Sequence, residues 1–325
     1  MKKSNGRNRT VVITGASSGF GRGIAERFAK DGMNLVLASR REGRVEELAR
    51  KCEKHGARAL AVKTDVSLRE QVEELAQRAR SHFGRIDIWI NNAGVGTFGR
   101  FTDTPIAEHE QVIRTNLLGA IYGSWMAMRE FQRRGQGILI NIASMAGISG
   151  TAYASSYAAS KHGLRGLDKS LRQELKANHE KTIRVCTVMP TSMDTPFFQH
   201  AGTHLGHPVR PIPPVYDPKK VIDAIYRLAY EPQDEVVIGT RGHVGRFVGK
   251  ISPKTIEKVM TKSIHTAQME QKETAPESSA SVFEPVSYGD SVYGGWKTRS
   301  ASKAALSIAA SAAVAGALWW RRRAA

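Results

Sequence analysis

Cysteine is scarce in this chain. The 325 residues include two cysteines, Cys52 and Cys186, which lie far apart in the sequence. Two distant thiols provide neither a disulfide framework nor the spacing of a metal site. We therefore expect reduced thiols in the core of a cytoplasmic protein. Residues 1–9 are polar and basic and run straight into an apolar segment, so we also expect no secretory signal.

Acidic residues are too few to balance the basic ones. The chain has 48 Lys and Arg against 30 Asp and Glu, a formal net charge of +18. The excess is uneven, with +4 on residues 1–9, a basic N-terminal arm, and +7 on residues 241–325. Basic ends can face anionic lipid or nucleic acid, or they can simply be solvated. No recognisable nucleic-acid module accompanies the charge, so we expect no nucleic-acid partner.

Long apolar runs are missing until the end of the chain. Residues 261–303 are polar, and we predict that they form a linker. Residues 304–320 are then 17 uncharged residues, mostly alanine, which end in two tryptophans before three arginines. As a helix they approach the thickness of a bilayer core, and the Trp–Arg end is typical of an interface anchor. We predict an apolar helix over residues 304–325, whose segment 304–323 either associates with a membrane or docks on protein.

Short apolar runs instead alternate regularly with charged, amphipathic segments. The apolar runs predict strands, and the segments between them predict helices, including one long helix over residues 108–133. Strands that alternate with helices form a parallel sheet covered on both faces. We therefore predict an α/β fold, a three-layer doubly wound sheet, in one domain over residues 10–260. The expected strands are 10–14, 34–39, 57–66, 86–90, 137–143, 183–189 and 235–239.

A glycine-rich turn follows the first predicted strand. It places glycines where a backbone must approach a phosphate, and it opens a helix whose N-terminus favours anions. Ordinary tight packing of a strand against a helix is the alternative interpretation. The spacing is TGxxxGxG rather than the more familiar GxGxxG. The turn reads Thr14, Gly15, Ala16, Ser17, Ser18, Gly19, Phe20 and Gly21.

Small or polar residues also follow the later predicted strands. Asn92, Ser144 and Pro190 each come at the end of a strand, as Gly15 does. Open parallel sheets bind ligands beyond the carboxyl ends of their strands. We therefore expect these residues to converge on one site, although they are far apart in the sequence.

A tyrosine and a lysine four residues apart, Tyr157 and Lys161, suggest proton transfer at that site. Residues four apart share a helix face, and a neighbouring cation is expected to lower the high pKa of a phenol. A second pair, Tyr216 and Lys220, has the same spacing. There Pro218 fits the first turn of a new helix, so we expect Tyr216 to lie outside it and interpret that match as accidental.

Taken together, the glycine turn, the Asn91-Asn92-Ala93-Gly94 segment, Asn116, Ser144 and the Tyr157–Lys161 pair resemble the short-chain dehydrogenase/reductase family. The resemblance covers about residues 10–239. It implies a Rossmann-like sheet of about seven strands and an NAD(P)-dependent activity on an alcohol or a carbonyl.

The resemblance also implies a role for each catalytic candidate. Tyr157 is expected to be the acid or base, and Lys161 to lower its pKa and bind the nicotinamide ribose. Ser144 is expected to hold the substrate oxygen, and Asn116 to position a water molecule beside Lys161. The alternatives are purely structural: a strand-end serine that bonds to local backbone, and a helix-interior asparagine that makes structural bonds.

Cofactor-binding residues are implied in the same way. Asp65 and Val66 would border the adenine, and Asn92, Ala93 and Gly94 the adenine ribose. Pro190 and Thr195 would lie near the nicotinamide, with Thr195 meeting its carboxamide. One departure from the family pattern is Thr191, which follows Pro190 where the family commonly has glycine. The remaining expected contacts come from the glycine turn: Thr14, Gly15, Ser17, Ser18, Gly19, Phe20 and Gly21.

The choice between NADP and NAD depends on the end of the second strand. An acidic residue there would bind the ribose hydroxyl of NAD, whereas an arginine suits the 2′-phosphate of NADP. The sequence has Ser39, Arg40 and Arg41 at this place and no acid. A planar guanidinium can pair with phosphate, so we predict NADP through Arg40 and interpret Arg41 as a surface residue.

Residues 191–217 are expected to form a substrate lid. They are rich in Pro, Gly and Phe, which points to a lipophilic alcohol or ketone as the small-molecule substrate. His200, His204 and His207 are spaced like metal ligands, but Gly and Pro interrupt any shared helix face. We favour surface or substrate-lining histidines and predict no metal site.

Two function classes remain open after these observations. The first is an NADPH-dependent carbonyl reductase, or an alcohol dehydrogenase in the reverse direction. The second is a non-catalytic NADP-binding scaffold at a membrane. Neither class fixes whether the chain forms a homo-oligomer.

Overall fold

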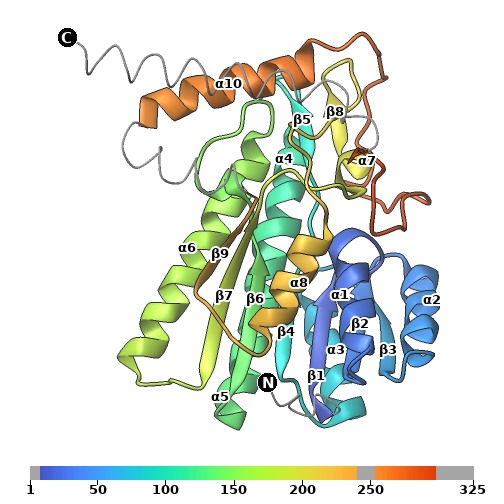
Figure 1. Cartoon of the computed structure of the whole chain (residues 1–325), viewed down its shortest axis with the longest axis vertical. Helices are drawn as coiled ribbons and strands as arrows, with labels where there is room; N and C mark the ends of the chain where they lie inside the picture. The colour runs from blue at the N-terminus through green and yellow to red at the C-terminus, as the bar shows by residue number, and fades with distance from the viewer. Residues whose placement is uncertain (1–7, 240–252, 298–325) are drawn as a thin grey trace, which may run out of the picture.

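A seven-stranded parallel sheet organises the chain. The computed structural model describes residues 8–239 and 253–297. The sheet order is β3-β2-β1-β4-β6-β7-β9, and every pairing is parallel. Helices cover both faces, which confirms the predicted three-layer Rossmann-like fold (Figure 1). The strands are β1 (Thr10–Thr14), β2 (Asn34–Ser39), β3 (Arg58–Lys63), β4 (Ile88–Asn91), β6 (Gly137–Ile142), β7 (Ile183–Pro190) and β9 (Glu235–Ile238).

Successive residues of each central strand enter two different cores. In β1, Val11 and Ile13 face the core made with α1, α2 and α8, whereas Val12 faces the core made with α3 and α5. A strand buried on both faces needs apolar residues at every position, which is why the predicted strands are continuous apolar runs. The helices are α1 (Gly19–Ala29), α2 (Glu42–Glu53), α3 (Arg69–Phe83), α5 (Gly119–Arg134), α6 (Ser155–Ala177) and α8 (Lys219–Leu228).

The region predicted as one helix over residues 108–133 is interrupted. It consists of α4 (Ile106–Ile113), one π-helical turn (Arg114–Leu118) and then α5. Apolar periodicity does not distinguish such a turn from a continuous helix, because the chain stays helical throughout. Single π turns inside α-helices are frequent at functional sites, and this one carries Asn116.

A second, two-stranded parallel sheet was not predicted. It joins β5 (Thr97–Gly99) to β8 (Gly202–His204), with Thr97 opposite Gly202 and Gly99 opposite His204. Each strand has three residues, which is too short for a period-two pattern to be visible in the sequence. Through β8, the sheet attaches the expected lid to the loop that follows β4.

The predicted linker over residues 261–303 is wrong for its described part. Residue 261 lies inside α10 (Pro253–Met269), and residues 277–297 run back across the body of the protein, from α10 past α7 (Phe197–His200) towards α1 and α2 (Figure 1). We call residues 277–297 the C-terminal strap. Its polar composition predicted a linker, but its backbone carbonyls accept hydrogen bonds from arginines elsewhere in the fold.

The apolar helix predicted over residues 304–325 lies outside the described residues, as do residues 1–7 of the basic arm. In the part of the chain that the structure describes, no helix is both long and apolar enough to cross a membrane.

Candidate active site

At Gly15 and Gly21, the glycine turn after β1 is packed too closely for a side chain, against the end of β4 and within the turn itself. A Cβ on Gly21 would lie 2.3 Å from the Gly15 carbonyl oxygen, and one on Gly15 would lie 2.7 Å from Ala93 Cα. Gly15 also has a φ of +65°, which side chains disfavour. The turn is therefore a bare backbone cradle, which is the surface that a dinucleotide phosphate requires.

Hydrogen bonds fix the same turn to the segment after β4. Thr14 Oγ1 accepts from the amides of Asn92 and Ala93 at 3.0 and 3.1 Å. Asn92 Nδ2 returns bonds to the carbonyls of Thr14 and Gly15 at 2.9 and 3.1 Å. The ends of β1 and β4 thus form one rigid floor.

A cavity of about 1930 Å³ extends from this floor along the carboxyl ends of the strands. Most of the predicted site residues line it, whereas Thr14, Gly21 and Asn116 do not. Thr14 and Asn116 instead hold lining segments in place from behind through their hydrogen bonds. The predicted residues that line the cavity are Gly15, Ser17, Ser18, Gly19, Phe20, Arg40, Asp65, Val66, Asn92, Ala93, Gly94, Ser144, Tyr157, Lys161, Pro190 and Thr195.

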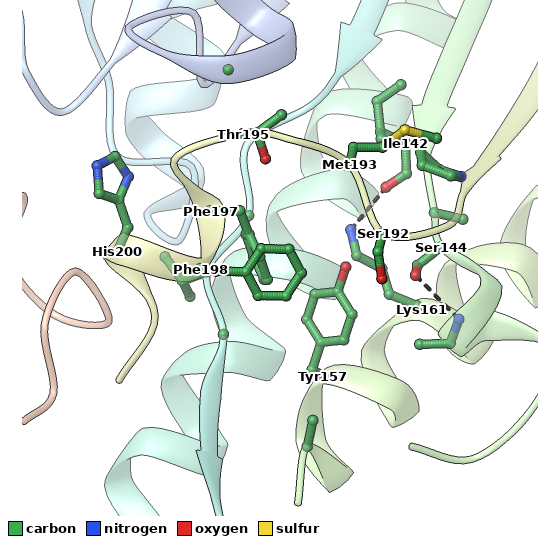
Figure 2. Close-up of a pocket in the computed structure, with 18 of the residues that line it drawn as sticks. Ile142, Ser144, Tyr157, Lys161, Ser192, Met193, Thr195, Phe197, Phe198 and His200 are labelled. Atoms are coloured by element: carbon green, nitrogen blue, oxygen red, sulfur yellow. Dashed lines mark hydrogen bonds between the residues drawn. The ribbon is translucent and has the colours of Figure 1, made fainter. Parts of the chain in front are cut away.

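Tyr157 and Lys161 extend into the cavity from successive turns of α6 (Figure 2). Lys161 Nζ lies 5.6 Å from the centroid of the Tyr157 ring and donates a 2.8 Å hydrogen bond to the Ile142 carbonyl at the end of β6. The helical spacing therefore brings the two side chains together, as the sequence predicted. The strand-end carbonyl fixes where the ammonium lies.

The pKa values of this pair differ from the sequence expectation. Burial raises the pKa of Tyr157 to about 12, and a hydrogen bond with the Ser144 side chain acts in the opposite direction. Burial lowers the pKa of Lys161 to about 8. The predicted lowering of the phenol pKa by Lys161 is thus not found: burial decides both shifts, because desolvation disfavours both charged forms. Tyr157 is consequently a neutral phenol that retains its proton at neutral pH.

Ser144 lies where β6 ends and a short 3-10 turn (Met145–Gly147) begins. Its Oγ accepts a 3.1 Å bond from the Ala146 amide and also bonds with Tyr157. The structural interpretation therefore holds at this residue, and its role in holding a substrate oxygen stays a prediction. The backbone bond fixes the hydroxyl, and the fixed hydroxyl lies next to the phenol.

Asn116 is buried in the π-helical turn. Its Oδ1 accepts from the Val95 amide at 2.8 Å, and its Nδ2 donates to the Val95 carbonyl at 2.9 Å and to Ser160 Oγ at 3.2 Å. These bonds join the loop after β4 to α6. Asn116 therefore braces the segment next to Lys161 in this structure, which corresponds to its structural interpretation.

Two arginines stand at the end of β2 beside the cavity. Burial lowers the pKa of Arg40, and Asp65 counteracts that shift. Arg41 Nε donates a 3.1 Å bond to Ser17 Oγ in the glycine turn. The interpretation of Arg41 as a surface residue is therefore incomplete, because its side chain reaches the nucleotide turn. The sequence Ser39-Arg40-Arg41 already placed a second arginine at the end of the predicted second strand, and this was the signal for its contact with the turn.

Thr191 occupies the place where glycine was expected without strain. Its amide and its Oγ1 both donate to the Ile238 carbonyl, each at 3.1 Å, and it does not have a positive φ. The next residues lead to Thr195, which is buried and lines the cavity. The departure from the family pattern therefore leaves the loop well formed.

Aromatic residues of the lid form one wall of the cavity near Tyr157. The rings of Tyr157 and Phe197 lie 5.4 Å apart, and Phe197 contacts Phe198 edge to face at the same distance. Phe98, Ala154, Leu205 and Val209 belong to the same apolar cluster. This end of the cavity therefore offers an apolar surface beside a phenol.

The three lid histidines have separate partners. His200 Nε2 lies 3.1 Å from the Tyr288 carbonyl, His204 bonds to Glu108 at 2.9 Å, and His207 Nδ1 lies 2.8 Å from the Glu273 carbonyl. Among the residues that the structure describes, no group of three or more His, Cys, Asp or Glu could hold a metal ion.

The second Tyr–Lys match differs from the first in the way the sequence predicts. Helix α8 begins at Lys219, after Pro218, so Tyr216 precedes the helix. Tyr216 and Lys220 therefore do not share a helix face, although Lys220 Nζ lies 5.4 Å from the Tyr216 ring.

Comparison with known proteins places this fold and cavity in one family. Residues 9–205 match the model of the short chain dehydrogenase family. The chain is 32% identical over 286 residues to an uncharacterized oxidoreductase, YxnA, of Bacillus subtilis, covering 87% of this chain and 80% of that protein.

Two further similar proteins have an activity in their names. A 3beta-hydroxysteroid dehydrogenase of Eggerthella lenta is 38% identical over 192 residues, which cover 58% of this chain and 72% of that protein. An archaeal alcohol dehydrogenase from Thermococcus sibiricus, solved with 5-hydroxy-NADP, superposes with a TM-score of 0.62 at 27% identity over 71% of this chain and 95% of its own. The chain belongs to the short-chain dehydrogenase/reductase family and is an oxidoreductase acting on alcohol or carbonyl groups.

Proposed function

We propose that the protein is an NADPH-dependent reductase of apolar carbonyl compounds, or the corresponding alcohol dehydrogenase in reverse. The observation that carries the proposal is the Ser144–Tyr157–Lys161 group in one cavity with the glycine cradle. The residues present fit a dinucleotide, because the cradle leaves no room for a Cβ and two arginines stand beside it. NADPH would supply a hydride when bound there.

The proton chemistry belongs to the chain itself. Because burial keeps the pKa of Tyr157 high, its O–H is available as a donor to a substrate oxygen at neutral pH. Ser144 would hold that oxygen as a second donor. After the transfer, the phenolate would be stabilised by the Ser144 hydroxyl and the Lys161 ammonium, which the Ile142 carbonyl keeps in place.

NADP rather than NAD is supported by charge at the end of β2. Arg40 and Arg41 line the cavity there, together with Ser39 and no carboxylate from that strand end. Asp65 also lines the cavity, but its Oδ1 accepts bonds from the Ser67 amide and hydroxyl at 2.9 and 2.7 Å. We therefore propose Arg40 as the main phosphate partner, with Arg41 beside it.

The apolar end of the cavity supports a lipophilic substrate. Phe197, Phe198, Met145 and Ile148 line the space next to Tyr157, and burial of apolar area there favours an apolar ligand by roughly 25 cal/mol per Å². One relative is named as a hydroxysteroid dehydrogenase, which is consistent with a lipophilic substrate. Membrane association through residues 304–323 stays a prediction and would suit such a substrate.

Turnover with a panel of carbonyls tests this proposal. We expect the wild type to oxidise NADPH with bulky apolar ketones, faster than with small polar ones and faster than with NADH. Tyr157→Phe should lose about 10²–10⁴-fold in kcat while still binding NADPH. A Tyr122→Phe variant is the matched control, because Tyr122 lies in α5 and does not line the cavity.

Retained turnover in Tyr157→Phe would reject the mechanism. NADPH binding by the wild type without turnover of any carbonyl would instead favour the non-catalytic scaffold.

A further inference from the structure

The C-terminal strap, residues 277–297, lies across the cavity rather than inside it. Ser281, Pro285 and Val286 line the same cavity as Gly15 and Tyr157, and the space of about 1930 Å³ persists with the strap in place. A segment that walls a cavity without filling it leaves room for a ligand beneath. The strap is therefore a wall of the proposed cofactor pocket that no sequence motif indicated.

One part of the strap binds the groups that are expected to meet the phosphates. The Gly19 amide, at the start of α1, donates a 2.9 Å bond to the Ser291 carbonyl. Arg40 Nη2 donates to the Ser281 carbonyl at 2.6 Å, and Arg41 Nη1 donates to the Tyr288 carbonyl at 3.0 Å. The Gly19 amide is a single donor, so it is not available to a phosphate while it bonds to the strap. A guanidinium has five donors, so the neutral acceptors orient both arginines and leave further donors and the positive charge available.

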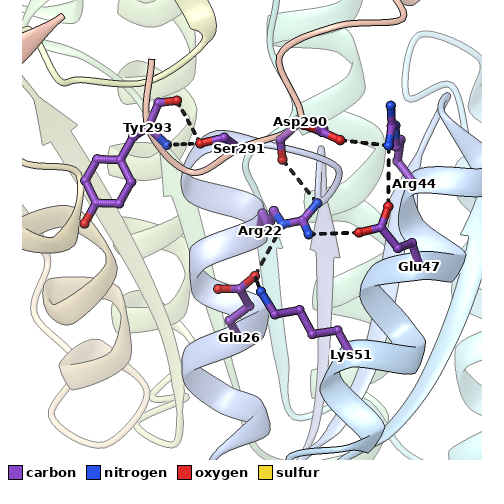
Figure 3. A network of polar contacts seen from close by, with 8 residues as sticks. All are labelled: Arg22, Glu26, Arg44, Glu47, Lys51, Asp290, Ser291 and Tyr293. Atoms are coloured by element: carbon purple, nitrogen blue, oxygen red, sulfur yellow. Dashed lines mark hydrogen bonds and ion pairs between the residues drawn. The ribbon is translucent and has the colours of Figure 1, made fainter. Parts of the chain in front are cut away.

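Asp290 attaches this part of the strap to two helices (Figure 3). Its carboxylate pairs with Arg44 of α2 at 2.8 Å, and its carbonyl accepts from Arg22 of α1 at 3.2 Å. The Arg44 and Asp290 side chains are 41% and 37% exposed. Exposed pairs contribute only about 0–1 kcal/mol, so this attachment can open without disturbing the core.

The other end of the strap holds the loop that carries Thr195. Trp296 donates from Nε1 to the Thr195 carbonyl at 3.0 Å and from its backbone amide to Asp194 Oδ1 at 2.7 Å. Its ring packs edge to face on Phe198 at 6.2 Å. Trp296 is thus a positioning residue, because it acts on the cavity through Thr195 and the aromatic wall of the lid.

We propose that the C-terminal strap is a clasp over the dinucleotide, which retains bound NADPH and must detach before the cofactor can exchange. The proposal rests on the NADPH-dependent function given above. The contacts of Asp290 with Arg22 and Arg44 are the part that opens. Trp296 keeps the strap in place at the nicotinamide end of the cavity. A clasp of this kind affects cofactor release before it affects the chemical step.

Stopped-flow displacement of bound NADPH, followed by its fluorescence, measures the release rate in the full chain. We expect Asp290→Asn to release NADPH about 2- to 5-fold faster, since loss of an exposed pair costs up to about 1 kcal/mol. Trp296→Phe should release it about 2- to 10-fold faster, since it loses one hydrogen bond worth about 0.5–1.5 kcal/mol. The matched controls are Asp103→Asn and Trp125→Phe, the same substitutions at exposed positions outside the strap. They should release NADPH at the wild-type rate.

Limited proteolysis gives an independent measurement on the unmodified chain. Saturating NADPH should protect peptide bonds within residues 277–297 from cleavage. Accelerated cleavage with NADPH, or tighter NADPH binding in Asp290→Asn and Trp296→Phe, would show that the strap competes with the cofactor and would overturn the clasp.

Release rates equal to those of the two controls would also overturn the clasp but leave the proposed function intact. Failure of the wild type to bind NADPH at all would reject the proposed function together with the clasp.

Discussion

The glycine turn and the C-terminal strap line the same cavity and meet where the Gly19 amide donates to the Ser291 carbonyl, but they are held in different ways. The turn is held by close packing, with Gly21 and Gly15 so near other backbone atoms that no side chain fits. The strap is held by hydrogen bonds from arginines to its carbonyls, by one from its own Trp296 indole to the Thr195 carbonyl, and by exposed ion pairs such as Arg44–Asp290. Close packing cannot yield in small steps, whereas surface polar contacts can be exchanged for water.

This difference separates a permanent surface from a removable one. A dinucleotide site needs a rigid cradle for recognition, but a fully enclosed site would trap its cofactor. The structure combines a rigid floor with a wall attached by individually weak contacts. Substitutions on the two sides are therefore expected to have effects of different size and kind.

The largest effect is expected on the side of the turn. In Gly21→Ala the new Cβ would lie 2.3 Å from the Gly15 carbonyl oxygen and 2.7 Å from Asn92 Nδ2. We expect destabilisation of about 1–3 kcal/mol from overpacking, and a loss of about 10²-fold or more in NADPH affinity because the cradle is displaced. Urea unfolding and NADPH titration measure the two quantities.

Gly43→Ala is the control for this substitution. Gly43 lies in α2 with nothing within 4 Å of an added Cβ, so alanine should be neutral or slightly stabilising. Equal effects of the two alanines would show that the turn is not closely packed and would remove the contrast with the strap.

A smaller, selective effect is expected at Arg40, which lines the cavity and donates to the strap. Arg40→Ala should weaken NADPH binding by about 10–100-fold, because a charge-assisted bond contributes about 1.5–3 kcal/mol. NADH has no 2′-phosphate, so its binding should change much less. Arg44→Ala loses the Asp290 contact without lining the cavity, and it should therefore affect NADPH and NADH alike.

Parallel losses for both cofactors in Arg40→Ala would contradict a phosphate contact. That result would leave Arg40 as an attachment point of the strap and nothing more.

The sequence predicted the glycine side far better than the strap side for a physical reason. Close backbone approach requires glycine, and a pair on one helix face requires a spacing of four residues. Gly21 and the Tyr157–Lys161 pair can therefore be recognised from residue type and spacing in the sequence. The strap uses mainly backbone carbonyls, which every residue has, and its acceptors Ser281, Tyr288 and Ser291 therefore carry no recognisable pattern. Its polar composition instead led to the incorrect prediction of a linker.

Two features of the site could not be predicted from the spacing of residues in the sequence. The π-helical turn around Asn116 keeps a helical pattern, so the sequence predicted one unbroken helix. The direction of the Tyr157 pKa shift depends on burial, and spacing alone does not report how much water the folded chain removes. The neighbouring cation was visible in the sequence, whereas the larger desolvation effect was not.

A further expected effect, on the free energy of unfolding, is a change of stability with pH that originates at Lys161. Below pH 8 the folded chain must bury a charged amine, and this cost disappears as pH rises from about 8, the folded pKa, towards the unfolded value. This term alone makes stability rise over that interval, since the unfolded state binds more protons there. Lys161→Met should remove that rise while losing turnover.

Urea unfolding at pH 7 and pH 10 checks this prediction. We expect Lys161→Met to gain roughly 1–3 kcal/mol on the wild type at pH 7, and the difference should narrow by pH 10. A constant difference between the two proteins at both pH values would mean that Lys161 is not a buried amine with a lowered pKa.

The most direct test of the central claim follows the hydride and the proton relay together. NADPH with both C4 hydrogens of the nicotinamide replaced by deuterium is incubated with an apolar ketone and either the wild type or Tyr157→Phe, and the alcohol is analysed by mass spectrometry. The account predicts one deuterium on the carbinol carbon with the wild type and a rate of labelled alcohol at least about 10²-fold lower with Tyr157→Phe. Alcohol without deuterium, or equal rates from the two proteins, would contradict it.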